Sequence, residues 1–217
     1  MDSQVQPESF VIDMSFTKKT TYYSGIVYEW NLPTGHTCPF ADDCLVKVDR
    51  DSGKFLNRSK TYRCYAANAE RFPGVRNSRW VNFENAKKGI IPKLPSTAKA
   101  VRIHASGDFF SQAYFDLWLQ FCRDNSEVEF WAYTKSLNYW VSRLNQIPSN
   151  LVLTASYGGR QDELIKTYNL KHAIVIPNKD AAIGMPIDIN DDLARTPDIS
   201  FYLLDNFSTL KGLKMKS

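Results

Sequence analysis

Apolar and polar residues alternate with two different periods along the second half of the chain. Short runs of β-branched and aromatic residues predict strands, and the segments between them repeat apolar residues every three or four positions, as amphipathic helices do. The predicted strands cover residues 100–105, 128–133, 151–155 and 172–176, and the predicted helices cover 111–123, 137–146 and 160–168. This alternation predicts an α/β protein with parallel strands joined by right-handed crossovers.

Polar residues fall on one face of several predicted strands. Because successive side chains of a strand point to opposite faces, Arg102, His104 and Ser106 are expected to share a face. The same spacing pairs Glu29 with Asn31, Glu129 with Tyr133, and Thr154 with Ser156. A parallel strand covered on both faces is normally apolar throughout. We therefore predict a partial or distorted TIM-like (βα) barrel with mostly parallel strands and a polar lumen; the alternative is an open sheet with one face in solvent.

The remaining parts of the chain are less regular. They predict an extended arm or edge strand at 1–20, a strand at 26–32, helices at 65–70 and 78–88, and a strand at 199–204. Residues 34–65 form a long loop, and loops of this length in compact domains are usually functional or else disordered. Residues 181–217 form an irregular C-terminal segment. We find no linker, and we predict a single α/β domain over residues 1–217.

Composition narrows the class of protein. Of the 217 residues, 43% are hydrophobic and 23% are charged, which is enough for a folded core and argues against disorder. The net charge of +4 is too small for a nucleic-acid-binding tail or a polybasic membrane anchor. No apolar run reaches the roughly 20 residues that span a bilayer, and the amino terminus lacks the layout of a secretory signal. We expect a cytoplasmic protein with no membrane partner.

Three of the four cysteines lie in or beside the long loop. Cys38, Cys44 and Cys64 are spaced as Cys-x5-Cys-x19-Cys, which is neither zinc-ribbon nor ferredoxin spacing. In a reducing cytosol, cysteines bind metal or react more often than they form disulfides. Three thiolates suit a four-iron four-sulfur cluster with one open iron, and we favour this iron-sulfur cluster. Zinc is one alternative, and ordinary small apolar residues are the other.

The remaining metal-ligating candidates are less well placed. A zinc ion would need a fourth ligand, for which His36, Asp42 and Asp43 are close in sequence. Cys122 falls on the apolar stripe of helix 111–123, so we predict that it is a buried core residue.

Polar and glycine-rich loops follow the predicted strands. Loops after parallel strands share one edge of the sheet, and ligands bind there. We predict that Ser106, Gly107 and Asp108 bind a cofactor, because the backbone of a glycine can approach a ligand closely. Gly158 and Gly159 could hold an anion or form a plain turn.

Four residues near this edge are predicted to be catalytic. His104 and Asp108 could transfer protons, Lys135 could pair with an anionic ligand, and Tyr133 is placed beside them. Each has a structural alternative: His104 as a satisfied core histidine, Asp108 as a helix cap, and Lys135 as a solvated lysine.

A basic and aromatic group lies near the third cysteine. It consists of Arg63, Arg71, Arg76, Arg79 and Trp80. It could contact nucleic acid or a host protein. The alternative, which we favour, is a structured surface around the cysteine loop.

Six motifs follow one another between Trp30 and Leu204. They are Thr37-Cys38-Pro39, Arg63-Cys64-Tyr65-Ala66-Ala67, Ser78-Arg79-Trp80-Val81-Asn82-Phe83, Arg102-Ile103-His104-Ala105-Ser106-Gly107-Asp108-Phe109, Ala132-Tyr133-Thr134-Lys135-Ser136 and Gly184-Met185-Pro186-Ile187-Asp188. In this order they resemble the phage gene-product-88-like family of tailed bacteriophages. The resemblance implies a phage protein acting in the host cytoplasm, and it implies no particular activity.

A more distant similarity is to radical S-adenosylmethionine enzymes. Those proteins hold a four-iron four-sulfur cluster on a three-cysteine loop after the first strand of a partial βα barrel, and a glycine-acidic motif after the second strand meets S-adenosylmethionine. Here Cys38 and Cys44 follow the first strand, and Ser106-Gly107-Asp108 follows the second. The spacing departs from the compact CxxxCxxC of those enzymes, which weakens radical chemistry more than cluster binding.

The sequence thus supports two hypotheses of function. The first is a phage-encoded cluster-binding redox or radical-type enzyme that binds a small molecule at the edge of the sheet. The second is a zinc- or cluster-stabilised protein without enzymatic activity that binds a host protein or nucleic acid.

Overall fold

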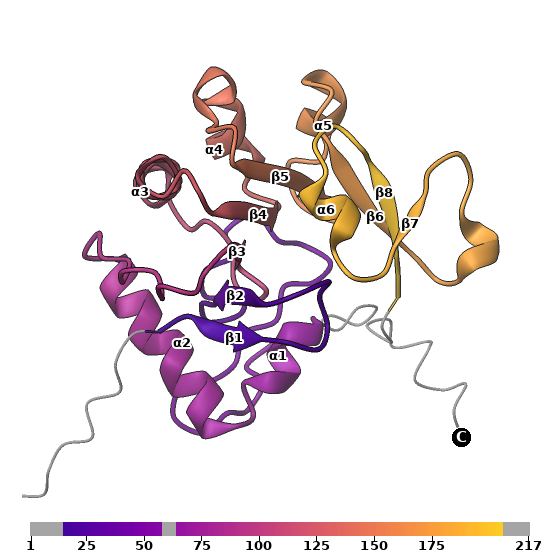
Figure 1. Cartoon of the computed structure of the whole chain (residues 1–217). Coiled ribbons are helices and arrows are strands. Elements are labelled where there is room, and N and C mark those ends of the chain that lie inside the picture. Colours follow the sequence, from indigo (N-terminus) through magenta and orange to yellow (C-terminus); the bar gives the residue numbers. More distant parts are fainter. Residues whose placement is uncertain (1–14, 58–63, 206–217) are drawn as a thin grey trace, which may run out of the picture.

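A curved eight-stranded sheet forms the centre of the computed structural model, which describes residues 15–57 and 64–205 (Figure 1). The strand order is β1-β2-β3-β4-β5-β6-β8-β7. The strands are β1 (Thr17–Lys19), β2 (Val27–Trp30), β3 (Ala100–Ile103), β4 (Glu129–Thr134), β5 (Leu151–Ser156), β6 (His172–Ile176), β7 (Ile187–Asp188) and β8 (Phe201–Leu204). All neighbouring strands are parallel except β1, which is antiparallel to β2. The predicted α/β class with a mostly parallel sheet is therefore confirmed.

Four helices lie outside the curve of the sheet (Figure 1). They are α2 (Pro73–Ala86), α3 (Gln112–Asp124), α4 (Leu137–Val141) and α5 (Glu163–Thr167). From β2 to β6 each crossover moves the chain by one strand in the same direction, which places the connecting helices on one face. The short helices α1 (Tyr65–Ala69) and α6 (Asp192–Arg195) and two 3₁₀ turns (Leu144–Gln146 and Lys179–Ala181) complete the structure.

Three helix predictions needed correction at their ends. Helix α2 begins at Pro73 rather than Ser78, because proline fits the first turn of a helix. The helix predicted at 137–146 ends at Val141 and is followed by the first 3₁₀ turn. Helix α5 begins only at Glu163, because the Asp162 carboxylate accepts the preceding backbone N–H groups of Gly158 and Gly159.

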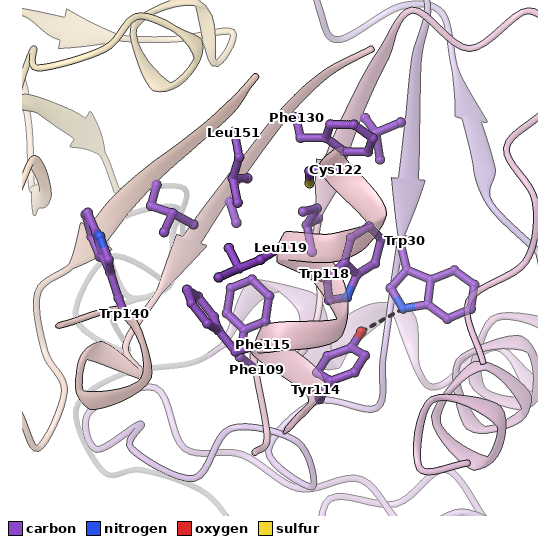
Figure 2. Packing of buried hydrophobic residues seen from close by; sticks show 14 of the residues in the cluster. Trp30, Phe109, Tyr114, Phe115, Trp118, Leu119, Cys122, Phe130, Trp140 and Leu151 are labelled. Carbon is purple, nitrogen blue, oxygen red and sulfur yellow. Dashed lines mark hydrogen bonds between the residues drawn. The ribbon is translucent and has the colours of Figure 1, made fainter. Parts of the chain in front are cut away.

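The outer face of the sheet packs against α3 in one large apolar core. Alternate residues of the strands, such as Phe130 and Leu151, meet the apolar stripe of α3 (Figure 2). Trp118 and Cys122 on this stripe are completely buried. The prediction that Cys122 is a core residue is confirmed, since burial among hydrocarbon side chains raises the pKa of its thiol and removes it from chemistry.

The inner face of the sheet carries the opposite set of alternate residues. Helix α6 lies on this side (Figure 1), and a small apolar cluster containing Trp131 and Phe201 fills part of it. Most of the polar residues predicted to share a face are here, His104 excepted, and Glu29 and Thr154 among them are buried. This face is therefore polar but paired largely within the protein, not open to solvent.

The predicted TIM-like barrel is not confirmed. Within the described residues the sheet is open, with β1 and β7 at its two edges. In the same part of the chain, no helix is long and apolar enough to cross a lipid bilayer. The single-domain assignment of residues 1–217 stays a prediction.

Candidate functional site

The loop that carries Cys38 and Cys44 crosses the carboxyl ends of the strands. It begins beside β3, where the Leu32 N–H donates to the Ser106 carbonyl at 2.9 Å. It reaches the segment after β5, where the Arg160 N–H donates to the Phe40 carbonyl at 2.9 Å. The two cysteines are therefore held over the edge at which α/β proteins bind ligands.

Burial and nearby charges raise the pKa values of the three candidate thiols. Burial is the main cause that raises the pKa of Cys38, and negative charges on Asp108, Cys64 and Cys44 add to it. Burial likewise raises the pKa of Cys64 to about 11, with a further contribution from Cys44. Cys38 and Cys64 thus lie near enough to other candidate cysteines to be affected by them, and burial favours the protonated thiol at all three positions.

Backbone N–H groups face two of these sulfurs. Hydrogen bonds from Ala67 and Ala66 lower the pKa of Cys64 against the larger effect of burial, and a hydrogen bond from Gly35 does the same at Cys38. Such hydrogen bonds stabilise thiolates and are one of the features that tune iron–sulfur clusters. The donor set therefore fits thiolate ligation.

The spacing of the ligands separates the possible metals. Among the residues that the structure describes, no three His, Cys, Asp or Glu side chains form a group that could hold a metal ion. A zinc ion with Zn–S bonds of about 2.3 Å needs its sulfur ligands within about 4 Å of one another. A cluster spreads its ligands over separate irons and so needs wider spacing. A zinc ion and a cluster thus require different ligand spacings, and the preference for a cluster stays a prediction.

None of the three suggested fourth ligands is aimed at a shared ion. The His36 Nε2 lies 2.9 Å from the Val48 carbonyl oxygen, and the His36 ring packs on Trp80. Asp42 and Asp43 are exposed, and Asp43 lies beside Gly158.

Asp108 lies buried beneath the cysteine loop. One carboxylate oxygen accepts the Thr134 hydroxyl at 2.6 Å and the Phe109 N–H at 2.7 Å, and the other accepts the Lys135 N–H at 2.9 Å. Burial raises the pKa of Asp108 to about 6 despite these hydrogen bonds. Asp108 therefore ties the loop after β3 to the end of β4 and remains a proton-transfer candidate.

The Lys135 side chain is directed into the protein. Its Nζ donates to the Ser156 carbonyl at 2.8 Å, to the Ser156 hydroxyl at 2.9 Å, and to the Tyr157 carbonyl. Its positive charge opposes the effect of burial on the pKa of Cys44. In this arrangement Lys135 supports the thiol site, and its donors are engaged with the chain instead of a ligand.

Ser106 and Gly107 connect two loops. The Ser106 hydroxyl donates to the Leu32 carbonyl at 2.9 Å, and its backbone N–H donates to the Asn31 side chain at 2.9 Å. Gly107 has φ +86°, and a Cβ there would lie 2.6 Å from the Thr37 hydroxyl oxygen. In the structure these two residues contact the start of the cysteine loop, and their cofactor-binding role stays a prediction.

His104 does not share a face with Arg102, which corrects the expectation from alternation. Strand β3 ends at Ile103, and His104 adopts φ +63°, which turns its side chain toward α3. Its Nε2 lies 2.9 Å from the Tyr114 hydroxyl, and its ring packs against Phe109. Burial lowers the pKa of His104 to about 3, so it is a neutral core histidine.

Tyr133 belongs to a buried network on the inner face that the sequence did not reveal. Its hydroxyl donates to Asp191 at 3.0 Å, and the Trp131 indole N–H donates to the same carboxylate at 3.2 Å. The Arg102 guanidinium pairs with Asp191 at 2.9 Å and also contacts the Tyr65 hydroxyl, next to Cys64. The network thus connects the cysteine site to the inner face.

A buried ion pair anchors both ends of the cysteine loop. The Arg79 guanidinium donates to the Glu70 carboxylate at 2.8 Å, and the same oxygen accepts the Thr34 N–H and hydroxyl, both at 2.7 Å. Arg76, also buried, donates to the carbonyl of Arg50. These arginines organise the loop, as the favoured alternative for the basic and aromatic group predicted.

Two members of that group have other surroundings. Arg71 is exposed, and Trp80 lies under the Arg50 guanidinium at 4.9 Å from its ring centroid. The predicted contribution of Arg63 lies outside the described residues. The N–H groups of Gly158 and Gly159 donate to the Asp162 carboxylate of the same chain at 2.8 and 3.0 Å. Of the two predictions for these glycines, the structure therefore favours the plain turn over the anion site.

Fold and site together define a mixed α/β protein with an open, mostly parallel sheet and a cysteine-bearing loop across the carboxyl ends of its strands. The family model described as Gene product 88 matches residues 12–208. The chain therefore belongs to the gene product 88 family, as its motifs predicted.

Two curated relatives come from bacteriophages. The gene 88 protein of Mycobacterium phage L5 is 46% identical over 55 residues, which are 25% of this chain and 23% of that protein. The gene 88 protein of Mycobacterium phage D29 is 47% identical over 55 residues, with the same shares. These local matches span about a quarter of either relative. No solved structure matches, and none of these matches supports a similarity to radical S-adenosylmethionine enzymes.

Proposed function

We propose that this protein binds an iron–sulfur cluster through Cys38, Cys44 and Cys64 and acts as a redox or radical-type enzyme on a small molecule. One observation carries the proposal. Three buried thiols lie near the carboxyl edge of a parallel sheet, where burial raises the pKa of each and Cys64 and Cys44 add to the effect at Cys38. Three protein ligands leave one iron of a four-iron cluster open, and such a cluster supplies one-electron chemistry or binds a ligand there.

The surrounding residues have defined supporting roles in this proposal. Arg79 and Glu70 hold the two ends of the loop, so that Cys38 and Cys64 stay together. Asp108 lies under the loop and could hold or release a proton near the thiols. The residues of the inner face would position the small molecule, since Tyr65 extends from the cysteine site to Arg102.

S-adenosylmethionine is the co-substrate that the radical version of the proposal requires. The version is tested directly by adding S-adenosylmethionine to the reduced protein and measuring its binding and cleavage. If S-adenosylmethionine is neither bound nor cleaved, the radical version is wrong, and the proposal is reduced to redox chemistry of another kind.

The cluster itself is tested by assaying iron and acid-labile sulfide in protein purified without oxygen. We expect about four irons and four sulfides per chain. Changing Cys38, Cys44 or Cys64 to serine should at least halve both values, because each substitution removes one of three thiolates. Cys122→Ala is the matched control, since Cys122 lies in the apolar core, and it should keep the full content.

A different metal content would favour the second function. Zinc without sulfide would contradict the cluster and indicate a metal-stabilised protein that binds a host protein or nucleic acid. That alternative has less support from the basic group, because Arg76 and Arg79 are buried within the protein. It predicts a salt-sensitive pull-down that survives His104→Ala and Asp108→Ala.

A further inference from the structure

The guanidinium of Arg102 stands at the centre of the polar inner face. It comes from β3, and its positive charge is paired with Asp191 through Nη1 at 2.9 Å. The Tyr23 hydroxyl also lies 3.1 Å from Nη1, and the Tyr133 ring lies 5.1 Å from the guanidinium carbon. Arg102 is therefore fixed in place on one side by two polar partners and an aromatic ring.

The hydrogen bonds of Arg102 leave one edge of the guanidinium incomplete. An arginine has five N–H donors in a rigid plane. Nη1 donates to the Tyr23 hydroxyl and forms the ion pair with Asp191, but Nη2 makes a single contact of 3.3 Å, to the Tyr65 hydroxyl. Nε is buried and has no partner among the described residues. A buried donor without a partner is unfavourable, so an unmet donor of this kind indicates a missing acceptor.

We propose that the Nε and Nη2 edge of Arg102 binds the carboxylate of a small organic acid. As a statement about the substrate, this inference rests on the proposed function. These two nitrogens point their N–H groups in parallel, and two parallel N–H donors match the two oxygens of a carboxylate. Nη1 is held by Asp191, so the open edge is presented in a fixed orientation.

The charges around Arg102 are balanced without using this edge. Asp191 pairs with Arg102 itself, and Glu29 is bound by the Tyr23 hydroxyl at 2.6 Å and approached by Lys19 at 3.8 Å. An acid would therefore be recognised by the geometry of the two donors and not by a general excess of positive charge. We accordingly expect selectivity for a planar carboxylate over other anions.

Tyr65 places this edge next to the cysteine site. Its hydroxyl contacts Arg102 Nη2 and donates to the Ala105 carbonyl at 2.8 Å, and its neighbour in the chain is Cys64. The Tyr65 side chain is about half exposed. A small movement of its ring would open Nη2 to an acid lying close to the thiols.

Nuclear magnetic resonance of the ¹⁵N-labelled full chain tests the proposal. The probes are acetate and succinate, titrated at constant ionic strength against the Arg102 Nε–H resonance, with the Trp131 indole N–H as a neighbouring reporter. We expect a saturable shift. Arg102→Lys keeps a positive charge beside Asp191 but lacks the two parallel N–H donors, and it should weaken binding at least tenfold. Arg143→Lys, in a partly exposed ion pair, is the matched control and should not weaken binding.

A second variant separates recognition from damage to the fold. Tyr65→Phe removes the hydroxyl that competes for Nη2, and it should tighten binding severalfold. The proposal is overturned if no saturable shift occurs, if Arg102→Lys binds as the wild type does, or if phosphate or chloride shifts the resonance more than acetate. Iron and sulfide are measured on the same sample. A shift without a cluster would reject the proposed function alone, and a cluster without a shift would reject this inference alone.

Discussion

Replacing Arg79 by methionine is expected to lower the free energy of unfolding by about 3–5 kcal/mol, the usual effect of breaking a buried ion pair. Arg79 is 8% exposed, and Glu70 is completely buried. Without the guanidinium, the Glu70 carboxyl group would lose its cation in a buried site that solvates a charge poorly. The other oxygen of this carboxylate already has no partner among the described residues, so there is no second cation to compensate.

The same substitution should also release the cysteine loop. Glu70 holds the Thr34 backbone at the start of the loop, and Arg79 donates to the Ala66 carbonyl just after Cys64 at 3.0 Å. The substitution removes the Ala66 contact and the cation that holds the Glu70 carboxylate in place beside Thr34, which would loosen both segments. We therefore expect the iron and sulfide content of Arg79→Met to fall along with its stability.

Urea unfolding of the wild type and three variants measures this effect. Arg143→Met breaks the partly exposed pair with Asp116 and should change stability by about 1 kcal/mol at most, the range of surface ion pairs. The double variant Glu70→Gln with Arg79→Met removes the buried charge as well, and it should recover part of the loss. An Arg79→Met protein within about 1 kcal/mol of the wild type would show that the pair is not required.

The regular half of the fold could be predicted because each strand alternates strictly. In β4, Phe130 and Ala132 enter the outer core while Trp131 and Tyr133 enter the inner face, as the period of two requires. Helix α3 could be predicted equally well, because its apolar stripe faces a single core. Where a single period decides which side is buried, the sequence is sufficient.

His104 shows where that reasoning ends. Alternation placed it beside Arg102, but the strand stops one residue earlier, and a backbone with positive φ reverses the direction of the side chain. Such a conformation is rare for a residue other than glycine, so no local pattern indicates it. Tertiary packing against Phe109 and Tyr114 decides it instead.

The candidate site was predictable in position but less so in its contacts. The spacing of Cys38, Cys44 and Cys64 pointed to a common site, which stays a prediction; in the structure, Cys44 and Cys64 add to the effect of burial on the pKa of Cys38. Asp191, by contrast, reaches Arg102 from the far end of the chain through α6, a four-residue helix too short to leave a periodic signal. Partners of this kind depend on the whole fold and cannot be inferred from their own segment.

The buried His104 is expected to make stability depend on pH. Burial lowers its pKa from the ordinary value of 6.5 to about 3. The unfolded chain therefore binds a proton at a pH where the folded protein does not, and stability is present above pH 6.5 and lost as the pH falls toward 3. Between pH 7 and pH 4 this loss amounts to about 3 kcal/mol, at 1.36 kcal/mol per pKa unit.

The variant His104→Asn isolates this contribution. Asparagine tolerates positive φ, and its side chain does not take up a proton in this pH range. The stability of the variant should therefore fall less between pH 7 and pH 4 than the stability of the wild type. Asp108 has a raised pKa and acts in the opposite direction, but it is present in both proteins and cancels from their difference. His172→Asn controls for the removal of a histidine as such.

The measurement is the free energy of unfolding in urea at several pH values. Wild-type and His104→Asn curves that run parallel over this range would mean that His104 titrates alike in the folded and unfolded chains, which its complete burial against Tyr114 and Phe109 argues against.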